Sequence, residues 1–200
     1  MRNLAPGNVL FHQGDDNKGV YVVATGLLAQ RVVHGNGTDV IVALAGPGQT
    51  LGARAFLRNT PHATSAVALI PSSVCAISRQ DAVRLTLDAP AAHMALVRCW
   101  LHALDRSQEA LLRNSALGTR ARLAALLLRF CAEQEDDGPV LIRVPLSRSD
   151  LAGILGILPE SLSRLLRQLR DEGVLGVSGR HFQIASVIRL VELAGSRPAP

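Results

Sequence analysis

Over roughly the first 88 residues, short apolar runs alternate with turns that contain glycine or proline. The runs are rich in β-branched side chains, which favours strands over helices. Between two of them lies His34-Gly-Asn-Gly37, and Asn-Gly tolerates the positive φ that a tight hairpin turn needs. This pattern predicts an antiparallel β-sandwich or barrel. The runs are Val9–Phe11, Val20–Val23, Leu27–Val33, Val40–Leu44 and Thr64–Leu69.

The pattern changes after Pro90, because the next glycine or proline is Gly118. Apolar residues recur there at intervals of three and four, which predicts one long helix over residues 89–117. Two apolar stripes lie side by side on this helix, so it can pack on its own domain and on a partner helix at once. The alternative is one wide core face. The first stripe is Met94, Val97, Leu101, Leu104, Gln108 (where the heptad is broken) and Leu111, and the second is Leu96, Trp100, Ala103 and Ala110.

Residues 118–200 are predicted to form a second, mainly helical domain. Gly118 and Thr119 indicate a break followed by an N-cap, with a new helix over Arg120–Glu133. An acidic turn follows this helix, and Val140–Val144 has the composition of a short strand. The long helix would therefore connect a β-rich domain to a helical one.

A helix, a tight turn and a second helix are expected next. Ser147 and Asp150 have the spacing of a capping box at the start of the first helix, which ends near Gly156. Pro159 suits the first position of the second helix, because its missing N–H costs nothing there. Gly173 suits the C-cap at the end of that helix. This order is typical of a helix-turn-helix.

The second helix of this pair has two chemically different faces, one of leucines and one of polar residues. Arginine can donate twice to guanine, glutamate can accept from cytosine, and serine adapts to either, so Glu160, Ser163 and Arg164 are the candidate base-reading residues for double-stranded DNA. The alternative is a solvated helix surface with ion pairs such as Glu160 with Arg164. The inward leucines are Leu162, Leu165, Leu166 and Leu169, and the polar positions are Glu160, Ser163, Arg164 and Arg167.

A hairpin wing is expected after the second helix, over Val174–Val177 and His181–Ile184. Arg180 lies at its tip, where a cation suits a phosphate contact. The candidate phosphate and wing residues are Ser147, Arg148, Arg167 and Arg180.

Composition excludes several classes of function. The chain has 200 residues, 48% of them hydrophobic and 18% charged, so it can bury a core and is not a disordered tail. Aromatic residues are only 3%, which disfavours a stacking platform for single-stranded nucleic acid. The net charge of +5 is shared almost equally by the two predicted domains, so charge alone does not locate a binding surface.

Cysteine usage and missing motifs narrow the choice further. Cys75, Cys99 and Cys131 are far apart and form no CxxC pair, which is typical of reduced thiols in a cytoplasmic protein. We see no signal peptide and no apolar stretch long enough to cross a membrane. No P-loop, HExxH or GxSxG motif is present, so we expect no enzyme. Two alternatives remain. One is an enzyme with an accessory nucleotide-binding-like β-roll, and the other is an effector-binding or protein-interaction module that does not bind DNA.

Nearly the whole chain resembles the Crp/Fnr family of bacterial transcription regulators. Its first residues resemble the opening of that family's cyclic-nucleotide-type β-roll, the middle resembles the effector cassette and the dimerisation helix, and the last third resembles the winged helix-turn-helix. The segments that carry the resemblance are Pro6–Asp15, Gly19–Val23, Gly26, Gly48–Gly52 and Leu146–Arg164 followed by the wing.

The resemblance implies an α+β protein with an effector-type β-roll at residues 1–88, a dimerisation helix at 89–117 and a winged helix-turn-helix at 118–200. It further implies a cytoplasmic homodimer that binds double-stranded DNA and contacts RNA polymerase. Ser163 places the recognition helix nearer to the Fnr branch than to the cyclic-AMP receptor branch, so the implied site is a palindrome with TTGAT-like half-sites. Leu158 and Pro159 depart from the family, which usually has a small hydroxyl residue as the N-cap.

The effector is not identified by the resemblance. In the cyclic-AMP receptor a glutamate and an Arg-Ser pair hold the nucleotide, and the matching positions here are Ala53 and Ala63-Thr64, which disfavours cyclic AMP. The absence of a cysteine before Cys75 disfavours the family's iron–sulfur cluster. Haem, as in relatives that sense NO or CO, stays open, as does the absence of any effector. The implied pocket positions are Gly52, Ala53, Arg54, Ala63, Thr64 and Ser107.

Most relatives have a further helix before the first roll strand. The resemblance therefore implies either a naturally short N-terminus or a start placed late.

Overall fold

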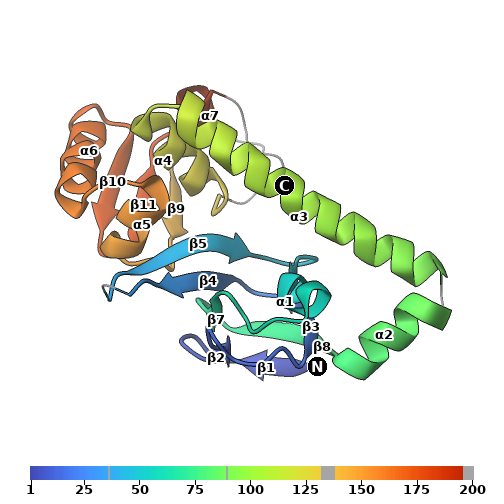
Figure 1. The fold of residues 1–200 in the computed structure, drawn as a ribbon. Coiled ribbons are helices and arrows are strands. Elements are labelled where there is room, and N and C mark those ends of the chain that lie inside the picture. The colour runs from blue at the N-terminus through green and yellow to red at the C-terminus, as the bar shows by residue number, and fades with distance from the viewer. Residues whose placement is uncertain (36, 89, 132–137, 196–200) are drawn as a thin grey trace. The chain divides into compact units, whose positions relative to one another are not determined.

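The computed structural model describes residues 1–35, 37–88, 90–131 and 138–195. The chain divides into two compact units, an N-terminal unit of Met1–Glu109 and a C-terminal unit of Ala110–Pro200 (Figure 1). We describe each unit by itself.

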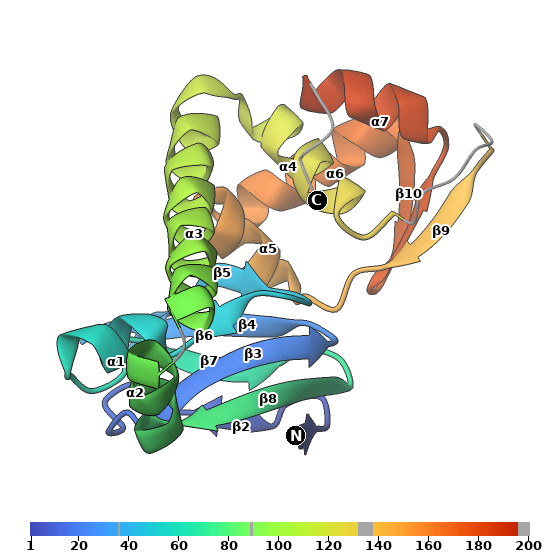
Figure 2. The same cartoon turned by 90° about the vertical axis from the view of Figure 1, so that its right-hand side faces the viewer.

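The N-terminal unit is a sandwich of two antiparallel four-stranded sheets, which confirms the predicted β-roll. Figure 2 shows β8 beside β3 in one of them. Leu4, Tyr21 and Val74 of one sheet share a buried cluster with Phe11 and Leu28 of the other, so the core lies between the sheets. One sheet has the order β1 (Arg2–Leu4), β8 (Ser72–Ser78), β3 (Gly19–Thr25), β6 (Thr50–Leu51), and the other β2 (Val9–Phe11), β7 (Ser65–Ala68), β4 (Leu28–Val33), β5 (Asp39–Ala45).

Two glycines allow these strands to pack closely. Gly19 has φ 153°, and a Cβ there would lie 2.0 Å from the Ile77 carbonyl oxygen on the neighbouring strand. Gly26 turns the chain from β3 into β4 with φ 91°, and a Cβ there would lie 2.2 Å from Ser72 Oγ. Any larger residue at either position would push the strands apart.

The expectation that the first 88 residues are all strands and turns is wrong in two places. Helix α1 spans Ala53–Arg58, and helix α2 spans Arg79–Asp88. Helix α1 is too short to show a periodic pattern, and glycine and asparagine in left-handed conformations bound it. The sequence does contain a signal for the start of α2, because serine is a preferred N-cap residue. Ser78 Oγ accepts a hydrogen bond from the Asp81 backbone N–H at 3.1 Å in the manner of an N-cap.

The long helix α3 spans Pro90–Ala116, close to its predicted bounds, and α4 spans Thr119–Leu128. The N-cap of α4 is Gly118, so the prediction that Thr119 caps it is wrong; Thr119 is its first helical residue. The helix also ends at Leu128 rather than Glu133, with Arg129 as the C-cap. The expected acidic turn falls mostly on residues 132–137, which lie outside the described residues.

The C-terminal unit packs helices against a three-stranded antiparallel sheet of order β10-β11-β9. The apolar side chains of α4 from Leu123 to Leu128 are all buried, so this helix forms the centre of the unit. The sequence pattern missed α7, which packs against α4 and buries Leu190 and Ala194. The remaining elements are β9 (Val140–Arg143), α5 (Arg148–Leu155), α6 (Pro159–Asp171), β10 (Leu175–Ser178), β11 (His181–Ile184) and α7 (Val187–Ala194).

Within the described residues, none of the helices combines the length and the hydropathy needed to cross a bilayer.

Candidate nucleic-acid interface

The turn between α5 and α6 is built by local hydrogen bonds. Ser147 Oγ accepts from the Asp150 backbone N–H at 3.0 Å, and the Asp150 carboxylate accepts from the Ser147 N–H at 3.1 Å, which confirms the capping box. Gly156 ends α5 with φ 63°, and the Ile157 N–H donates to the Ala152 carbonyl at 3.0 Å. The entry to α6 is therefore held at a defined angle.

Helix α6 has the two faces that the sequence predicted. Leu162, Leu166 and Leu169 are buried and Leu165 is half-buried, so the leucine face anchors the helix to its unit. The four polar residues of the other face are all exposed. These are Glu160, Ser163, Arg164 and Arg167.

The side chains of the exposed face make few contacts with one another. Ser163 Oγ donates to the Pro159 carbonyl at 3.0 Å, and Arg164 Nη2 lies 3.5 Å from Ser161 Oγ. Among the described residues, no ion pair joins Glu160 to Arg164, so the alternative of a surface held by that pair is not what the structure shows. The arginine keeps donors that can bind a ligand. The roles of these residues in reading bases stay predictions.

The wing is the hairpin β10–β11, with Gly179 at its turn in a left-handed conformation, φ 59°. Arg148 is tied to this turn: its Nη2 lies 3.5 Å from the Gly179 carbonyl oxygen and its guanidinium 5.4 Å from the ring centroid of Phe182. Partial burial lowers the pKa of Arg148 from its usual value. Arg180 is exposed at the tip. The phosphate contacts expected of Ser147, Arg148, Arg167 and Arg180 stay predictions.

An ion pair that the sequence pattern did not reveal anchors the far end of α6. Arg120, at the start of α4, donates through Nη1 to Glu172 Oε1 at 2.8 Å, and a second bond joins Nη2 to Oε2. Gln168 Nε2 donates to Glu172 Oε1 at 3.0 Å. The hydrogen bond from Arg120 holds the pKa of Glu172 below its usual value. No local spacing could have paired residues 52 positions apart.

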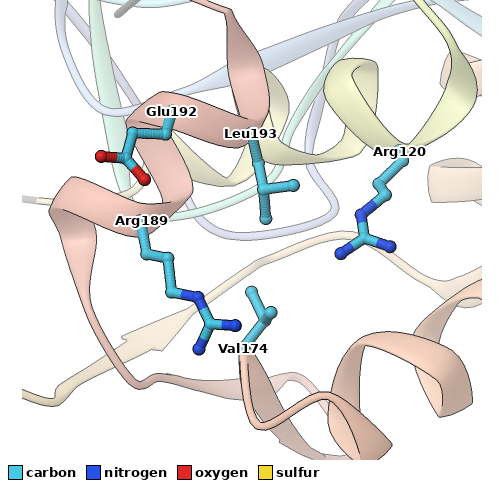
Figure 3. Close-up of a pocket in the computed structure, with 5 residues that line it drawn as sticks. All are labelled: Arg120, Val174, Arg189, Glu192 and Leu193. Atoms are coloured by element: carbon cyan, nitrogen blue, oxygen red, sulfur yellow. The ribbon is translucent and has the colours of Figure 1, made fainter.

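A shallow cavity of about 250 Å³ lies beside this ion pair. Figure 3 shows Arg120 and Arg189 reaching toward Val174 from opposite sides, with Leu193 of α7 above it. Glu192 is the remaining lining residue. None of the predicted base-reading or phosphate residues lines this cavity.

Around Gly52 the N-terminal unit has a tightly bonded polar cluster. Gly52 is the N-cap of α1 with φ 78°, and Asn17 Nδ2 donates to both the Gly52 and the Gly19 carbonyls, at 3.1 and 2.9 Å. His62 is buried and stacks on Phe11 with ring centroids 3.7 Å apart. Burial lowers the pKa of His62. The sequence pattern singled out Gly52 but missed Asn17 and the place of His62.

The predicted effector positions fall on separate elements. Ala53 and Arg54 begin α1, whereas Ala63 and Thr64 precede β7, where Thr64 Oγ1 lies 3.5 Å from Gln30 Oε1. Ser107 lies on α3 and donates to the Ala103 carbonyl of the same helix at 3.0 Å. Ala53, Ala63 and Thr64 carry no charged group, and Arg54 is the one charged residue among the predicted pocket positions. The exclusion of cyclic AMP stays a prediction.

The described residues also lack the donor set that metal ions need, which consists of His, Cys, Asp and Glu side chains that lie close together. Within them, no group of three or more His, Cys, Asp or Glu side chains could hold an ion. Cys75 is exposed, and Cys99 and Cys131 are half-buried. Five of the six histidines are exposed, and the sixth is His62.

Helix α3 exposes most of its first apolar stripe. Leu101 is 53% exposed, Leu104 54% and Leu111 69%. Val97 is half-buried, and Gln108 is exposed.

Of the second stripe, Trp100, Ala103 and Ala110 are half-buried, and the side chain of Leu96 lies outside the described residues. Met94 is 50% exposed and Leu112, beside the first stripe, 66%. Most of the first stripe is thus exposed, and the role of α3 in dimerisation stays a prediction.

Two segments of the chain match the models of known domain families. Residues 1–88 match the model of the cyclic nucleotide-binding domain, and residues 121–193 match the model of the Crp-like helix-turn-helix domain. The chain is 28% identical over 195 residues to the anaerobic regulatory protein of Pasteurella multocida, covering 96% of this chain and 71% of the relative. It is also 28% identical over 194 residues to the fumarate and nitrate reduction regulatory protein of Vibrio cholerae, covering 96% and 77%.

Solved structures share the fold. A transcriptional regulator of the CRP family from Thermus thermophilus superimposes with a TM-score of 0.82 at 21% identity, covering 98% of both chains. FixK2 from Bradyrhizobium japonicum superimposes with a TM-score of 0.78 at 24% identity, covering 100% of this chain and 98% of that one. An effector-type domain followed by a helix-turn-helix defines a class, the transcription regulators. Within that class, the chain belongs to the Crp/Fnr family.

Proposed function

We propose that this protein binds a TTGAT-like DNA palindrome as a homodimer. The observation that carries the proposal is the exposed face of α6, where Glu160, Ser163 and Arg164 are free of the core while the leucines of the same helix anchor it. These side chains have the donors and acceptors that distinguish base edges in the major groove. The proteins named as fumarate and nitrate reduction regulators, to which the chain is similar, support the Fnr-like half-site.

The exposed apolar stripe of α3 supports the proposed homodimer. Its exposed leucines form an apolar surface that water solvates poorly, and a second copy of the same helix would cover it in a parallel pair. A two-fold dimer places its recognition helices about 34 Å apart, one turn of B-DNA, and this spacing requires a palindromic site. RNA polymerase is the expected partner of the DNA-bound dimer, and the cytoplasm its compartment.

For the N-terminal unit we propose an effector other than cyclic AMP, or none. The supporting observation is the uncharged set Ala53, Ala63 and Thr64 at the positions where a cyclic nucleotide would need ionic partners. An effector would act by shifting the dimer toward the helix spacing that fits DNA. Equal DNA affinity with and without candidate effectors would instead define a constitutive binder. A Soret band in the absorption spectrum of the protein as purified would identify haem.

A salt titration of duplex binding tests the main proposal. We expect the affinity for a TTGAT palindrome to exceed that for a scrambled duplex by about 1,000-fold or more, with both falling steeply as salt rises. Equal and weak binding to both duplexes would favour the alternative, an effector-binding or protein-interaction module that does not read DNA.

A further inference from the structure

The first residue at the entry to the recognition helix is an exposed leucine. Leu158 is the N-cap of α6, in extended conformation with φ −73° and ψ 149°, and it makes no side-chain capping bond. Its side chain is 68% exposed. Pro159 follows as the first helical residue and is also exposed. The base-reading end of α6 therefore begins with two apolar residues.

Leu158 contributes little to the stability of the folded C-terminal unit. An N-cap residue stabilises a helix through a side-chain oxygen that accepts a backbone N–H, and leucine has none. A leucine that is mostly in water also gains little from burial. Leu158 contributes neither a cap nor a core contact, so its chemistry is better matched to a ligand that covers it.

We propose that Leu158 contacts the C5-methyl group of a thymine in the outer part of each TTGAT half-site. The proposal rests on the proposed function, because it requires α6 to enter the major groove by its N-terminal end. In that orientation Leu158 lies just before Glu160, one of the predicted base-reading residues.

The chemistry of the entry favours a methyl group over the other groups in the groove. Leu158 has no polar side-chain atom, and Pro159 has no N–H, so together they offer a phosphate fewer donors than a hydroxyl cap would. Thymine is the only base that presents a methyl group in the major groove. Covering a polar base edge with leucine would leave that edge without a hydrogen-bond partner, so Leu158 also disfavours the other bases.

Replacing thymidine by deoxyuridine removes only this methyl group. The replacement therefore tests whether the protein contacts the methyl group itself. The duplex carries two TTGAT half-sites, and each thymine in turn is replaced symmetrically in both. For the full-length wild type we expect one position at which the affinity falls about three- to fivefold per half-site, the effect of uncovering one methyl. In L158S the affinity should no longer change when that thymine is replaced by deoxyuridine, because serine does not reach the methyl group.

The serine variant keeps the test independent of folding, since serine is a preferred N-cap and should leave the thermal midpoint unchanged or higher. Leu141→Ser is the matched control, because Leu141 is 69% exposed on β9 of the same unit. L141S should retain the full deoxyuridine effect.

Two results would overturn the inference in distinguishable ways. If wild type and L158S lose the same affinity at every thymine while the palindrome is still preferred over a scrambled duplex, Leu158 reads no methyl and the proposed function stands. If wild type does not prefer the palindrome, the proposed function fails and the inference fails with it.

Discussion

Helices α3 and α6 both expose a long face, but the two faces have opposite chemistry. On α3 the exposed residues include a stripe of leucines, and Leu101, Leu104 and Leu111 are each more than half exposed. On α6 the leucines are buried, and Arg164 and Arg167 are among the exposed residues. An apolar face requires another apolar surface, whereas a face of cations and hydrogen-bond donors suits a polyanion. The exposed face of each helix thus indicates the class of partner.

The largest effect is expected when charges are placed on the apolar face of α3. Leu101→Glu with Leu104→Glu would place like charges opposite one another in the proposed dimer, so we expect monomers in analytical ultracentrifugation. The affinity for the palindrome should fall about 100-fold or more, because each recognition helix would then bind alone. His102→Glu, which adds a charge at an exposed polar position of the same helix, is the control. A dimer with wild-type affinity in the doubly charged variant would show that α3 does not dimerise the protein.

The second prediction concerns the polar face of α6. Arg164→Ala should cost about 1–3 kcal/mol of binding free energy on the palindrome and much less on a scrambled duplex, because a base contact carries sequence information. Fluorescence anisotropy with both duplexes measures the difference. Arg170→Ala is the control, an arginine with 61% side-chain exposure near the other end of the same helix. Equal losses on the two duplexes would mean that Arg164 does not read a base.

A smaller effect would separate base contacts from phosphate contacts on the same face. Arg167→Gln should weaken binding to cognate and scrambled duplexes alike. It should also reduce the slope of log affinity against log salt by about 0.9 for each phosphate that the arginine neutralises in the wild type. Arg170→Gln should leave that slope unchanged. A weakening confined to the palindrome would place Arg167 among the base readers instead.

The smallest effect concerns the anchor of α6. Arg120 holds the pKa of Glu172 below its ordinary value, so the folded state binds this proton less readily than the unfolded state. The stabilisation is therefore complete above the ordinary glutamate pKa and is lost as the pH falls below it. Urea unfolding should show that Glu172→Gln destabilises the protein at pH 7 and makes less difference at pH 4. The exposed Asp171→Asn is the control, and an equal loss at both pH values would argue against the pair.

What could be predicted from the sequence was mostly local. The capping box of Ser147 and Asp150, the proline start of α6 and its two faces all depend on residues within a turn or two of each other. The missed helices α1, α2 and α7 are short, and short apolar segments do not distinguish helix from strand by period alone. Helix α7 still had a local signal, because Ser186 caps its start and Gly195 its end.

The chemistry of the effector region was also partly visible in the sequence. The uncharged residues at positions 53, 63 and 64 were identified by resemblance, but the cluster that surrounds Gly52 was not. Its members Asn17 and His62 come from turns far apart in the chain, and the stacking of His62 on Phe11 joins residues with no common local pattern. Only the packing of the two sheets brings them together.

The class of fold, the two faces of α6 and the apolar stripe of α3 could all be predicted from the chain alone, because hydrophobic periodicity and capping are properties of neighbouring residues. The tertiary structure alone decided the order of strands in each sheet, the ion pair between Arg120 and Glu172, and the exposure of Leu158. Each of these depends on which distant segments meet, and that is settled by the burial of the whole core rather than by any one segment.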